Sequence, residues 1–290
     1  MKFKLFLEVS TKLNLIEYIR KEFHPLWKIR RLKWLNKSLS LIDFPFRFKD
    51  RATGFSIYVY WYRDLPYLFG RNYVSEKEVK SAINLILQNE DIKSFWDAGA
   101  NIGYYSLLIS SLLPDSKIIA FEPFTKNINL LTRTINFNRI RNIKLIKKAV
   151  SNKSGAEEFL VDDISGATGQ FKSLLRKNDD FQISNAYGLR KTIQVETIKL
   201  DEMIDDGCEV PDLMKVDIEE AEEMMFQGAC KIIKSKKTKI VIETYNPKVL
   251  KLFKDNDYSI FLLDDSSNYA FIPNTSKQLI NSFGQKYREA

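Results

Sequence analysis

The chain alternates short apolar segments with longer segments in which apolar residues recur every three or four positions. This pattern predicts buried strands at 94–96, 117–121, 142–150, 213–216 and 239–243. It predicts helices from 76 to about 88, from the end of a glycine turn to 113, and over 125–138, 200–206 and 219–234. Ser75 and Glu78 stand in capping-box spacing at the first of these helices. Such alternation predicts an α/β fold whose mostly parallel sheet is covered by helices on both faces.

Three segments depart from this alternation. Residues 155–200 contain several glycines and a period-two stretch at 192–197, which predicts hairpin strands and a loop. Residues 258–263 predict part of an antiparallel hairpin. Residues 55–62 are rich in aromatic and β-branched types and predict a further strand.

Positive charge is concentrated near the N-terminus. The formal net charge is +8, and residues 1–80 hold 17 Lys and Arg against 8 Asp and Glu. Residues 11–42 mix these charges with apolar residues at helical spacing, and Pro25 divides them into two expected helices. We therefore expect a basic N-terminal extension over 1–72 and a second domain over 73–290. The extension either packs on that domain or docks on an anionic membrane surface, a charged glycan or nucleic acid.

The composition is that of a globular protein, with 290 residues that are 44% hydrophobic and 28% charged. Cys208 and Cys230 form no C-x-x-C pair, which predicts neither a disulfide framework nor a structural zinc. Glu8 and Lys12 interrupt the first apolar stretch, and no window reaches the roughly 18 apolar residues of a membrane-spanning helix. We expect a cytoplasmic protein, peripheral at the inner membrane surface where the extension docks on lipid.

A glycine-containing turn follows the first strand of the regular region. Asp97 ends this strand, and the Gly99-x-x-x-Gly103 spacing lacks the middle glycine of the dinucleotide motif G-x-G-x-x-G. Asp97 would repel a pyrophosphate but attract an ammonium or a sulfonium. Glu122, at the end of the next strand, is placed to accept both hydroxyls of a ribose. The pattern favours S-adenosylmethionine, which carries a sulfonium and no phosphate.

Carboxylates also follow the last two strands of the regular region. Asp217 and Glu219 come after the strand at 213–216, and Glu243 closes the strand at 239–243. Because parallel strands end at one edge of a sheet, these groups should lie near the bound ligand. They either orient and deprotonate a hydroxyl or hold a divalent metal that does so. We expect Glu220 and Glu223 to face solvent at a helix N-terminus.

Together these motifs resemble the FkbM-type S-adenosylmethionine-dependent methyltransferases. The matching segments are 97–106 (DAGANIGYYS), 120–123 (AFEP), 149–151 (AVS), 197–201 (TIKLD), 211–222 (PDLMKVDIEEAE), 228–229 (GA) and 240–243 (IVIE). They occur in the family's order over about residues 75–265. The resemblance implies a Rossmann-like class I methyltransferase domain, with a mostly parallel seven-stranded sheet, that acts on a hydroxyl oxygen, often of a sugar or a natural product.

The resemblance also implies roles for single residues. By position, the amino acid end of the cofactor would be held by Asp97, Gly99, Ala100, Asn101 and Gly103, its ribose by Glu122 and Pro123, and its adenine edge by Val150, while Asp217, Glu219 and Glu243 would line the reaction site. The family favours glycine at the position of Glu220, where a side chain either crowds the substrate or faces solvent. We expect methyl transfer to a hydroxyl of a glycan or glycolipid, assisted by Asp217 or by a bound divalent metal.

Two other enzyme classes are less well supported. Tyr187-x-x-x-Lys191 copies the spacing of an NAD(P)-dependent dehydrogenase, but Gly188 interrupts the helix that would place both side chains on one face. A hydrolase is disfavoured because His24, the single histidine, lies in the basic extension and the chain has no Gly-x-Ser-x-Gly motif.

Two further alternatives concern binding. The basic and aromatic residues near the N-terminus suggest methylation of RNA or DNA. Residues 217–220, however, lack the Asn/Asp-Pro-Pro-aromatic motif that grips a flipped base. A non-catalytic membrane- or glycan-binding module would have no need of Asp97, Glu122 and Asp217.

Overall fold

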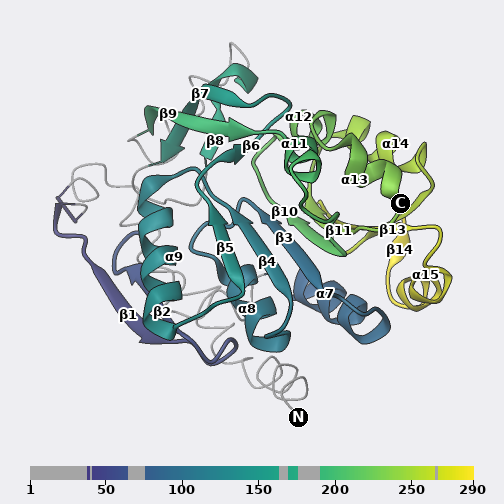
Figure 1. The fold of residues 1–290 in the computed structure, drawn as a ribbon, viewed down its shortest axis with the longest axis horizontal. Coiled ribbons are helices and arrows are strands. Elements are labelled where there is room, and N and C mark those ends of the chain that lie inside the picture. The colour runs from purple at the N-terminus through teal and green to yellow at the C-terminus, as the bar shows by residue number, and fades with distance from the viewer. Residues whose placement is uncertain (1–37, 40, 65–75, 163–168, 176–189, 265–266) are drawn as a thin grey trace, which may run out of the picture.

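The computed structural model describes residues 38–39, 41–64, 76–162, 169–175, 190–264 and 267–290. A central sheet organises this part of the chain, with the strand order β14-β12-β13-β11-β10-β3-β4-β5 (Figure 1). The strands are β3 (Ser94–Ala98), β4 (Lys117–Phe121), β5 (Ile143–Ile146), β10 (Leu213–Val216), β11 (Lys239–Glu243), β12 (Tyr258–Leu262), β13 (Asn268–Pro273) and β14 (Arg288–Glu289). The strands from β11 to β5 are parallel, and β13 and β14 run antiparallel to their neighbours. The mostly parallel α/β fold is confirmed, but the sheet has eight strands rather than seven because the C-terminal residues add β14 at an edge.

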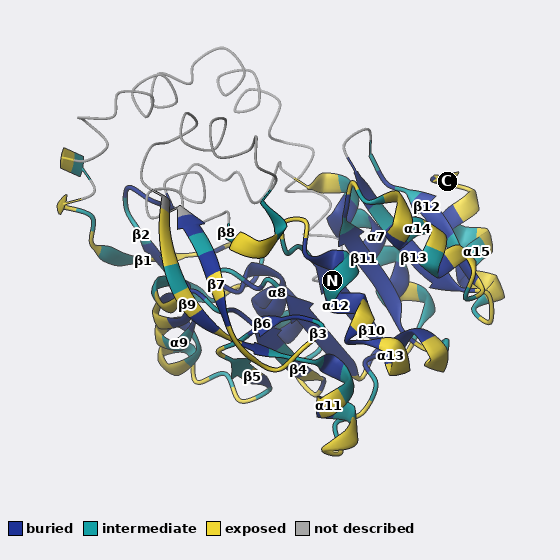
Figure 2. Ribbon diagram, turned by 90° about the horizontal axis from the view of Figure 1, so that it is seen from above, coloured by how far each residue is buried: buried dark blue, intermediate teal, exposed yellow. Residues whose placement is uncertain are grey.

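Helices cover both faces of the central sheet. One face carries α7 (Lys77–Asn89), α8 (Tyr104–Leu112), α9 (Thr125–Asn138) and α15 (Lys277–Gly284), and the other carries α11 (Leu200–Asp205), α12 (Glu222–Gln227), α13 (Cys230–Ser235) and α14 (Pro247–Lys254). Successive strand residues point to opposite faces, so Phe95 belongs to one apolar cluster and Trp96 to the other. Figure 2 shows β3, β10 and β11 buried between the two helical layers, whose outer sides are exposed.

A second sheet has the order β6-β9-β7-β8. It consists of β6 (Ala149–Val150), β7 (Gly155–Asp162), β8 (Gly169–Phe171) and β9 (Arg190–Ile198), with a 3-10 turn over Lys172–Leu174. The hairpin strands expected between 155 and 200 are confirmed. The single strand expected at 142–150 is wrong, because the chain leaves the central sheet after β5 and β6 pairs in parallel with β9.

A hairpin of β1 (Pro45–Lys49) and β2 (Ser56–Tyr60) precedes this domain. The backbone amides of Ser56 and Tyr58 donate to the side chains of Asn138 and Thr134 on α9, at 2.9 and 3.0 Å. Ile57 and other buried residues of β2 join the core. The strand expected at 55–62 is thus confirmed and is built into the fold. The helices expected within 11–42 lie almost entirely outside the described residues.

Two helix boundaries differ from the expectation. The helix predicted over 219–234 begins only at Glu222, because Glu219 and Glu220 have φ of 45° and 64°, which a right-handed helix excludes. It is also divided into the two helices α12 and α13. The chain breaks again at Gly228, where a Cβ would lie 2.3 Å from the carbonyl oxygen of Ser151. At the start of α7 the N-cap is Glu76, in the left-handed conformation and without a side-chain cap bond. The expected cap Ser75 lies outside the described residues.

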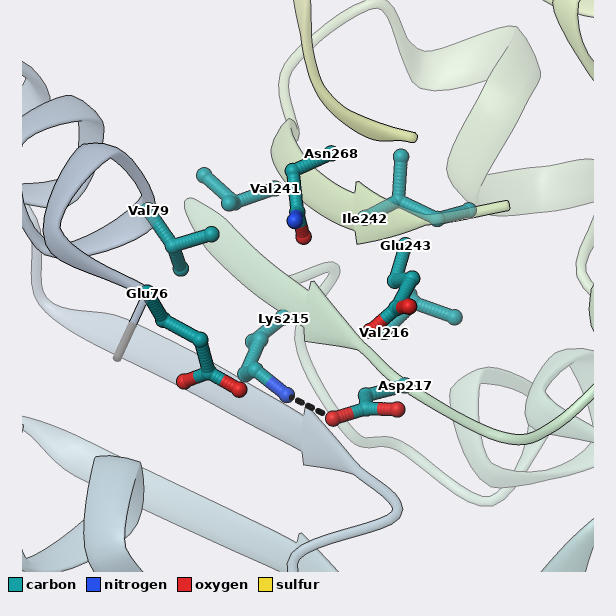
Figure 3. Close-up of a pocket in the computed structure, with 9 residues that line it drawn as sticks. All are labelled: Glu76, Val79, Lys215, Val216, Asp217, Val241, Ile242, Glu243 and Asn268. Atoms are coloured by element: carbon teal, nitrogen blue, oxygen red, sulfur yellow. Dashed lines mark hydrogen bonds and ion pairs between the residues drawn. The ribbon is translucent and has the colours of Figure 1, made fainter. Parts of the chain in front are cut away.

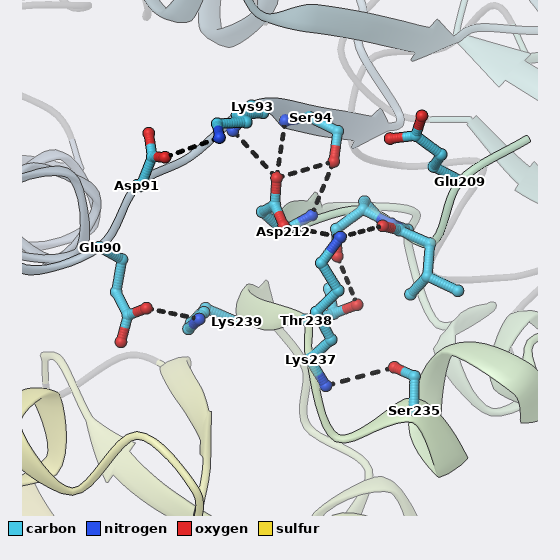
Figure 4. A network of polar contacts seen from close by, with 12 residues as sticks. Glu90, Asp91, Lys93, Ser94, Glu209, Asp212, Ser235, Lys237, Thr238 and Lys239 are labelled. Carbon is cyan, nitrogen blue, oxygen red and sulfur yellow. Dashed lines mark hydrogen bonds and ion pairs between the residues drawn. The ribbon is translucent and has the colours of Figure 1, made fainter.

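Polar contacts join the starts of three central strands (Figure 4). The Asp212 carboxylate accepts hydrogen bonds from the amides of Lys93 and Ser94, both at 2.9 Å, and pairs with Lys237 at 2.9 Å. Burial would raise the pKa of Asp212, but these partners outweigh burial and lower it. Lys239 pairs with Glu90 at 2.8 Å. These contacts align β3, β10 and β11, so their carboxyl ends meet at one opposite edge.

Candidate active site

The turn between β3 and α8 is held against the end of β4. The amides of Gly99 and Ala100 donate to the carbonyl oxygen of Phe121, at 3.1 and 2.9 Å. The amide of Asn101 donates to the Glu122 carboxylate at 2.8 Å. The glycine turn therefore meets Glu122 at the carboxyl ends of β3 and β4, and the roles of both toward a cofactor stay predictions.

Packing within the protein requires the two glycines of this turn. Gly99 has a φ of 81°, and a Cβ there would lie 1.9 Å from the carbonyl oxygen of Asp217. Gly103 has a φ of 84°, and a Cβ there would lie 2.3 Å from the Leu131 side chain. The sequence suggested that the glycines admit a ligand. The structure adds that the missing side chains let the Asp217 loop and α9 pack closely against the turn. Contact of the two glycines with a cofactor stays a prediction.

Asp97 is buried beneath the turn, with 1% of its surface exposed. Its Oδ2 accepts hydrogen bonds from the amide and the hydroxyl of Ser106, at 3.0 and 2.6 Å. Since Ser106 lies in the first turn of α8, which has no side-chain N-cap, Asp97 caps this helix from a distance. Its Oδ1 is buried and has no hydrogen-bond partner among the described residues. Burial raises the pKa of Asp97, although Lys215 and Ser106 oppose the rise.

Glu122 is buried at the end of β4. Its carboxylate accepts from the amides of Asn101 and Phe124, each at 2.8 Å. Burial raises the pKa of Glu122 to about 7 despite these bonds. The Asn127 side chain also hydrogen-bonds this carboxylate. Two carboxylate oxygens offer about four lone pairs, so one acceptor position is left for a ribose hydroxyl. Pro123 is half-buried beside it, and Val150 is buried on β6.

A shallow pocket lies at the carboxyl ends of β10 and β11 (Figure 3). It is lined by Glu76, Val79, Lys215, Val216, Asp217, Val241, Ile242, Glu243 and Asn268. Asp217 and Glu243 therefore share one pocket, as expected, whereas Glu219 is exposed and does not line it. In the described part of the chain, no group of three or more His, Cys, Asp or Glu side chains is arranged to hold a metal ion. The structure does not bring the three predicted acids together as a metal site.

Lys215 places a buried ammonium beneath these acids. Its Nζ lies 2.8 Å from Oδ2 of Asp217 and 4.8 Å from the ring centroid of Tyr105. Burial would lower the pKa of Lys215, but Asp217, Glu76 and Asp97 raise it to about 12. The ammonium therefore stays charged and compensates Asp217.

Glu243 is a pocket carboxylate with a raised pKa. Burial is the main cause that raises its pKa, and the negative charge of Asp217 adds to the rise. A carboxylate with a raised pKa accepts a proton more readily. Asp217, in contrast, is charge-paired with Lys215 and is better suited to orient a ligand.

Sequence reasoning missed four residues near this pocket. Lys215 and Glu76 line it, and the Tyr105 hydroxyl donates to the Glu76 carboxylate. Glu222 is buried at the start of α12 and accepts from the Thr244 hydroxyl at 3.1 Å. Burial raises the pKa of Glu222 to about 7. A lysine inside an otherwise apolar strand was the available signal for Lys215, and nothing in the local pattern distinguishes Glu222 from its exposed neighbours.

Comparison with known proteins identifies this arrangement. Residues 97–260 match the Methyltransferase FkbM domain over more than half of the chain. The chain belongs to the FkbM methyltransferase family. It is 26% identical over 190 residues to methyltransferase sdnD of Sordaria araneosa, an alignment that covers 57% of this chain and 73% of the relative. The enzyme is thus an S-adenosylmethionine-dependent methyltransferase.

Solved structures of methyltransferases are also similar to this methyltransferase. An FkbM methyltransferase from Methylobacillus flagellatus KT is 17% identical, with a TM-score of 0.42, and the match covers 62% of this chain and 43% of that chain. The present chain thus spans less than half the length of that protein. TYW2 of M. jannaschii in complex with AdoMet is 11% identical, with a TM-score of 0.41, over 78% of this chain and 83% of that one.

The charges at the strand ends of the methyltransferase fit its cofactor. Asp97, Glu122 and Asp217 would repel a phosphate, and the Lys215 ammonium is already bonded to Asp217. A sulfonium and an ammonium are attracted by the same acids. Oδ1 of Asp97, buried without a partner in the described structure, is the acceptor that a bound donor group would satisfy.

Glu220 faces solvent in this methyltransferase. Its side chain is exposed, does not line the pocket, and accepts from the Gln170 side chain at 2.9 Å. Its φ of 64° lies in the region that glycine adopts at least cost. The backbone conformation therefore suits the glycine that the resemblance led us to expect at this position. Glu223 is partly exposed and bonds Asn246 at 3.0 Å.

Two remaining expectations concern the rest of the chain. Lys191 of the dehydrogenase-like pair lies on the strand β9 rather than on a helix, and Tyr187 lies outside the described residues. Where the chain is described, no helix has both the length and the apolar character to cross a membrane.

Proposed function

We propose that this methyltransferase transfers the methyl group of S-adenosylmethionine to a hydroxyl oxygen of a sugar, in a glycan or a glycolipid. The observation that carries the proposal is the pair of carboxylates in one pocket, Glu243 with a raised pKa and Asp217 bonded to Lys215. A hydroxyl acceptor needs one group to orient it and one to receive its proton, and the two acids supply these roles.

Bound S-adenosylmethionine supplies an electrophilic methyl group on its sulfonium. In the proposed reaction, Asp217 orients the acceptor by accepting a hydrogen bond through Oδ1 from a neighbouring hydroxyl of the sugar, because Oδ2 is bonded to Lys215. The reacting hydroxyl donates its own hydrogen bond to Glu243. Glu243 receives the hydroxyl proton as the new oxygen–carbon bond forms and the sulfur–carbon bond breaks. The products are the methyl ether, a neutral thioether and protonated Glu243. Most of the rate should come from holding the hydroxyl in line with the methyl group.

The lining of the pocket favours a polyhydroxyl acceptor. Its polar members Glu76, Asp217, Glu243 and Asn268 carry acceptor oxygens that suit several hydroxyl donors. Its apolar members are valine and isoleucine, so the lining residues offer no aromatic ring on which a nucleobase would stack. These features support a sugar over a nucleic acid.

Transfer of a labelled methyl group to a panel of glycans, glycolipids and RNA tests the proposal. Glu243→Gln should lower turnover on the responding acceptor by about 10²–10⁴-fold, while calorimetry shows an unchanged affinity for S-adenosylmethionine. Glu289→Gln is the matched control, because Glu289 is exposed on the edge strand β14. RNA as the best acceptor would contradict the proposal. So would an Asp217→Ala variant with full activity and undiminished cofactor affinity.

The same assay decides how the hydroxyl is activated. Dialysis against a chelator should leave activity intact where Glu243 acts directly as the base. If chelation abolishes methyl transfer and added Mg²⁺ restores it, a divalent metal activates the hydroxyl instead. That metal would be held near Asp217 and Glu243, with or without Glu219.

We also propose that residues 11–42 hold the methyltransferase peripherally on the cytoplasmic surface of an anionic membrane. The support is the basic and apolar pattern of this segment. Deleting the chain as far as residue 50 would remove β1, so the test is made in the full chain, with Lys28, Arg30, Arg31 and Lys33 replaced by Gln. This variant should lose affinity for anionic vesicles, and unchanged affinity would contradict the proposal.

A further inference from the structure

The hairpin β1–β2 and the helix α9 share one outward surface, here called the hairpin–α9 face. It comprises Arg47 and Lys49 of β1 and Arg133 and Phe137 of α9, and we add Arg139 and Arg141 of the turn that follows α9; all six residues are exposed. The guanidinium of Arg47 on β1 lies 3.8 Å from the ring centroid of Phe137 on α9. In Figure 1 the hairpin lies beside α9. Lys49 lies two residues along β1 and so on the same side as Arg47, and Arg133 lies one helical turn before Phe137.

The charge of this face is entirely positive. Residues 123–156, which include α9 and β5, contain eight Lys and Arg and no Asp or Glu. No described acidic side chain forms an ion pair with Lys49, Arg133, Arg139 or Arg141. These cations are therefore available to an external anion.

The acids of the hairpin do not compensate this charge. Asp43 accepts from the amides of Tyr62 and Arg63, at 2.9 and 3.2 Å. Asp50 is buried and accepts from the amide of Thr53 at 2.7 Å, and Asp64 is buried in a pair with Arg63 at 3.0 Å. All three acids are bonded inside the hairpin.

Apolar side chains are exposed in the same part of the molecule. Five large hydrophobic residues are exposed in the described structure, and four of them lie on α9 or in the residues just before β1. They are Leu41 (81% exposed), Ile42 (60%), Phe44 (59%) and Phe137 (47%). Exposed apolar residues beside uncompensated cations are the pattern of a surface that contacts lipid headgroups and the upper acyl chains.

We propose that the hairpin–α9 face docks the folded domain on an anionic lipid bilayer. This contact is independent of the identity of the methyl acceptor. Apart from Leu41 and Ile42, its residues lie outside the segment 11–42. A nucleic acid fits less well, because Arg47 already covers one side of the Phe137 ring and because Leu41 and Ile42 offer no stacking surface. The N-terminal segment 1–37 is disfavoured as an occupant, since it carries ten Lys and Arg against three Glu and would be repelled.

Sedimentation of the full chain with vesicles tests the proposal. The vesicles are phosphatidylcholine alone and phosphatidylcholine mixed with phosphatidylglycerol. The triple variant Lys49→Gln, Arg133→Gln and Arg141→Gln should bind the anionic vesicles about 100-fold more weakly than the parent, from the usual contribution of each cation near such a surface. Leu41→Ser with Ile42→Ser should remove the binding that persists at high salt.

A matched control keeps the same change of net charge on another part of the molecule. Lys234→Gln, Lys254→Gln and Lys277→Gln alter exposed lysines on α13, α14 and α15, and this variant should bind like the parent. Equal vesicle binding by the two triple variants would overturn the proposal. A triple variant that loses affinity for a single-stranded RNA oligonucleotide but not for vesicles would overturn it as well.

Folding is checked by thermal melting and by the affinity for S-adenosylmethionine, neither of which should change in the triple variant. Were the triple variant to unfold, the single change Arg141→Gln should still weaken vesicle binding about fivefold. Parental binding by a folded Arg141→Gln variant would then contradict the proposal.

Discussion

One buried cation, Lys215, compensates the negative charges of the carboxylates in the active site. Its side chain is 8% exposed and lies 2.8 Å from Asp217, which is 33% exposed. Replacing Lys215 by Met keeps the volume of the apolar stem and removes the ammonium. Asp217, Asp97 and Glu76 would then repel one another, because Lys215 is their shared counterion.

The expected loss of stability follows from this burial. Breaking a fully buried ion pair costs about 3–5 kcal/mol. Water reaches part of Asp217 and screens the charge left behind, so we expect Lys215→Met to lower the free energy of unfolding by about 2–3 kcal/mol. For a chain of this size, such a change lowers Tm by about 3–5 °C.

The variant should also shift the pH dependence of methyl transfer. Lys215 lowers the pKa of Glu243, so without Lys215 this pKa rises further. Glu243 must be deprotonated to accept a proton, and the limb on which activity appears should move to higher pH. A loss of stability alone would leave that limb in place.

Denaturant unfolding of Lys215→Met, Asp217→Asn and the double variant measures the interaction as a double-mutant cycle. Lys215→Arg is the control, because it keeps the charge. The reasoning is refuted if Lys215→Met unfolds within about 0.5 kcal/mol of the parent, the usual error of additivity. A coupling energy near zero between Lys215 and Asp217 would also refute it.

Three other substitutions test the backbone and the buried acids. Gly99→Ala should lower the free energy of unfolding by more than about 2 kcal/mol and weaken S-adenosylmethionine binding in calorimetry, because of the left-handed φ and the Cβ contact with Asp217; parental stability would contradict this. Glu220→Gly should increase the free energy of unfolding by about 1 kcal/mol and so raise Tm, because glycine adopts a φ of 64° without strain. A lower Tm would contradict this and would show that the bond to Gln170 contributes more than the strain costs. The pKa of Glu222 is about 7 in the folded protein against about 4.3 unfolded, so the folded state binds its proton more tightly and stability falls as pH rises through this window. Glu222→Gln should remove this loss, and its unfolding free energy relative to the parent should increase by on the order of 2 kcal/mol between pH 5 and pH 8; parallel pH profiles would contradict the assignment.

Local pattern determined most of the fold of this methyltransferase. The strands β3, β4, β10 and β11 and the helix α9 were predicted, because the period of apolar residues reports which side of a regular element is buried. The meeting of the glycine turn with Glu122, and the placing of Asp217 and Glu243 in one pocket, followed from the rule that parallel strands end at one edge.

Only the tertiary structure decided the contacts between distant segments. The transfer of β6 to the second sheet depends on β9, more than forty residues away, and the break at Gly228 depends on the backbone of Ser151. Lys215 pairs with Asp217, and Tyr105 bonds to Glu76. Both contacts depend on which polar side chains the packed strands and helices bring within reach of each other. Periodicity along the chain records burial but not the partner of a buried charge, because that partner is set by the three-dimensional packing of strands and helices.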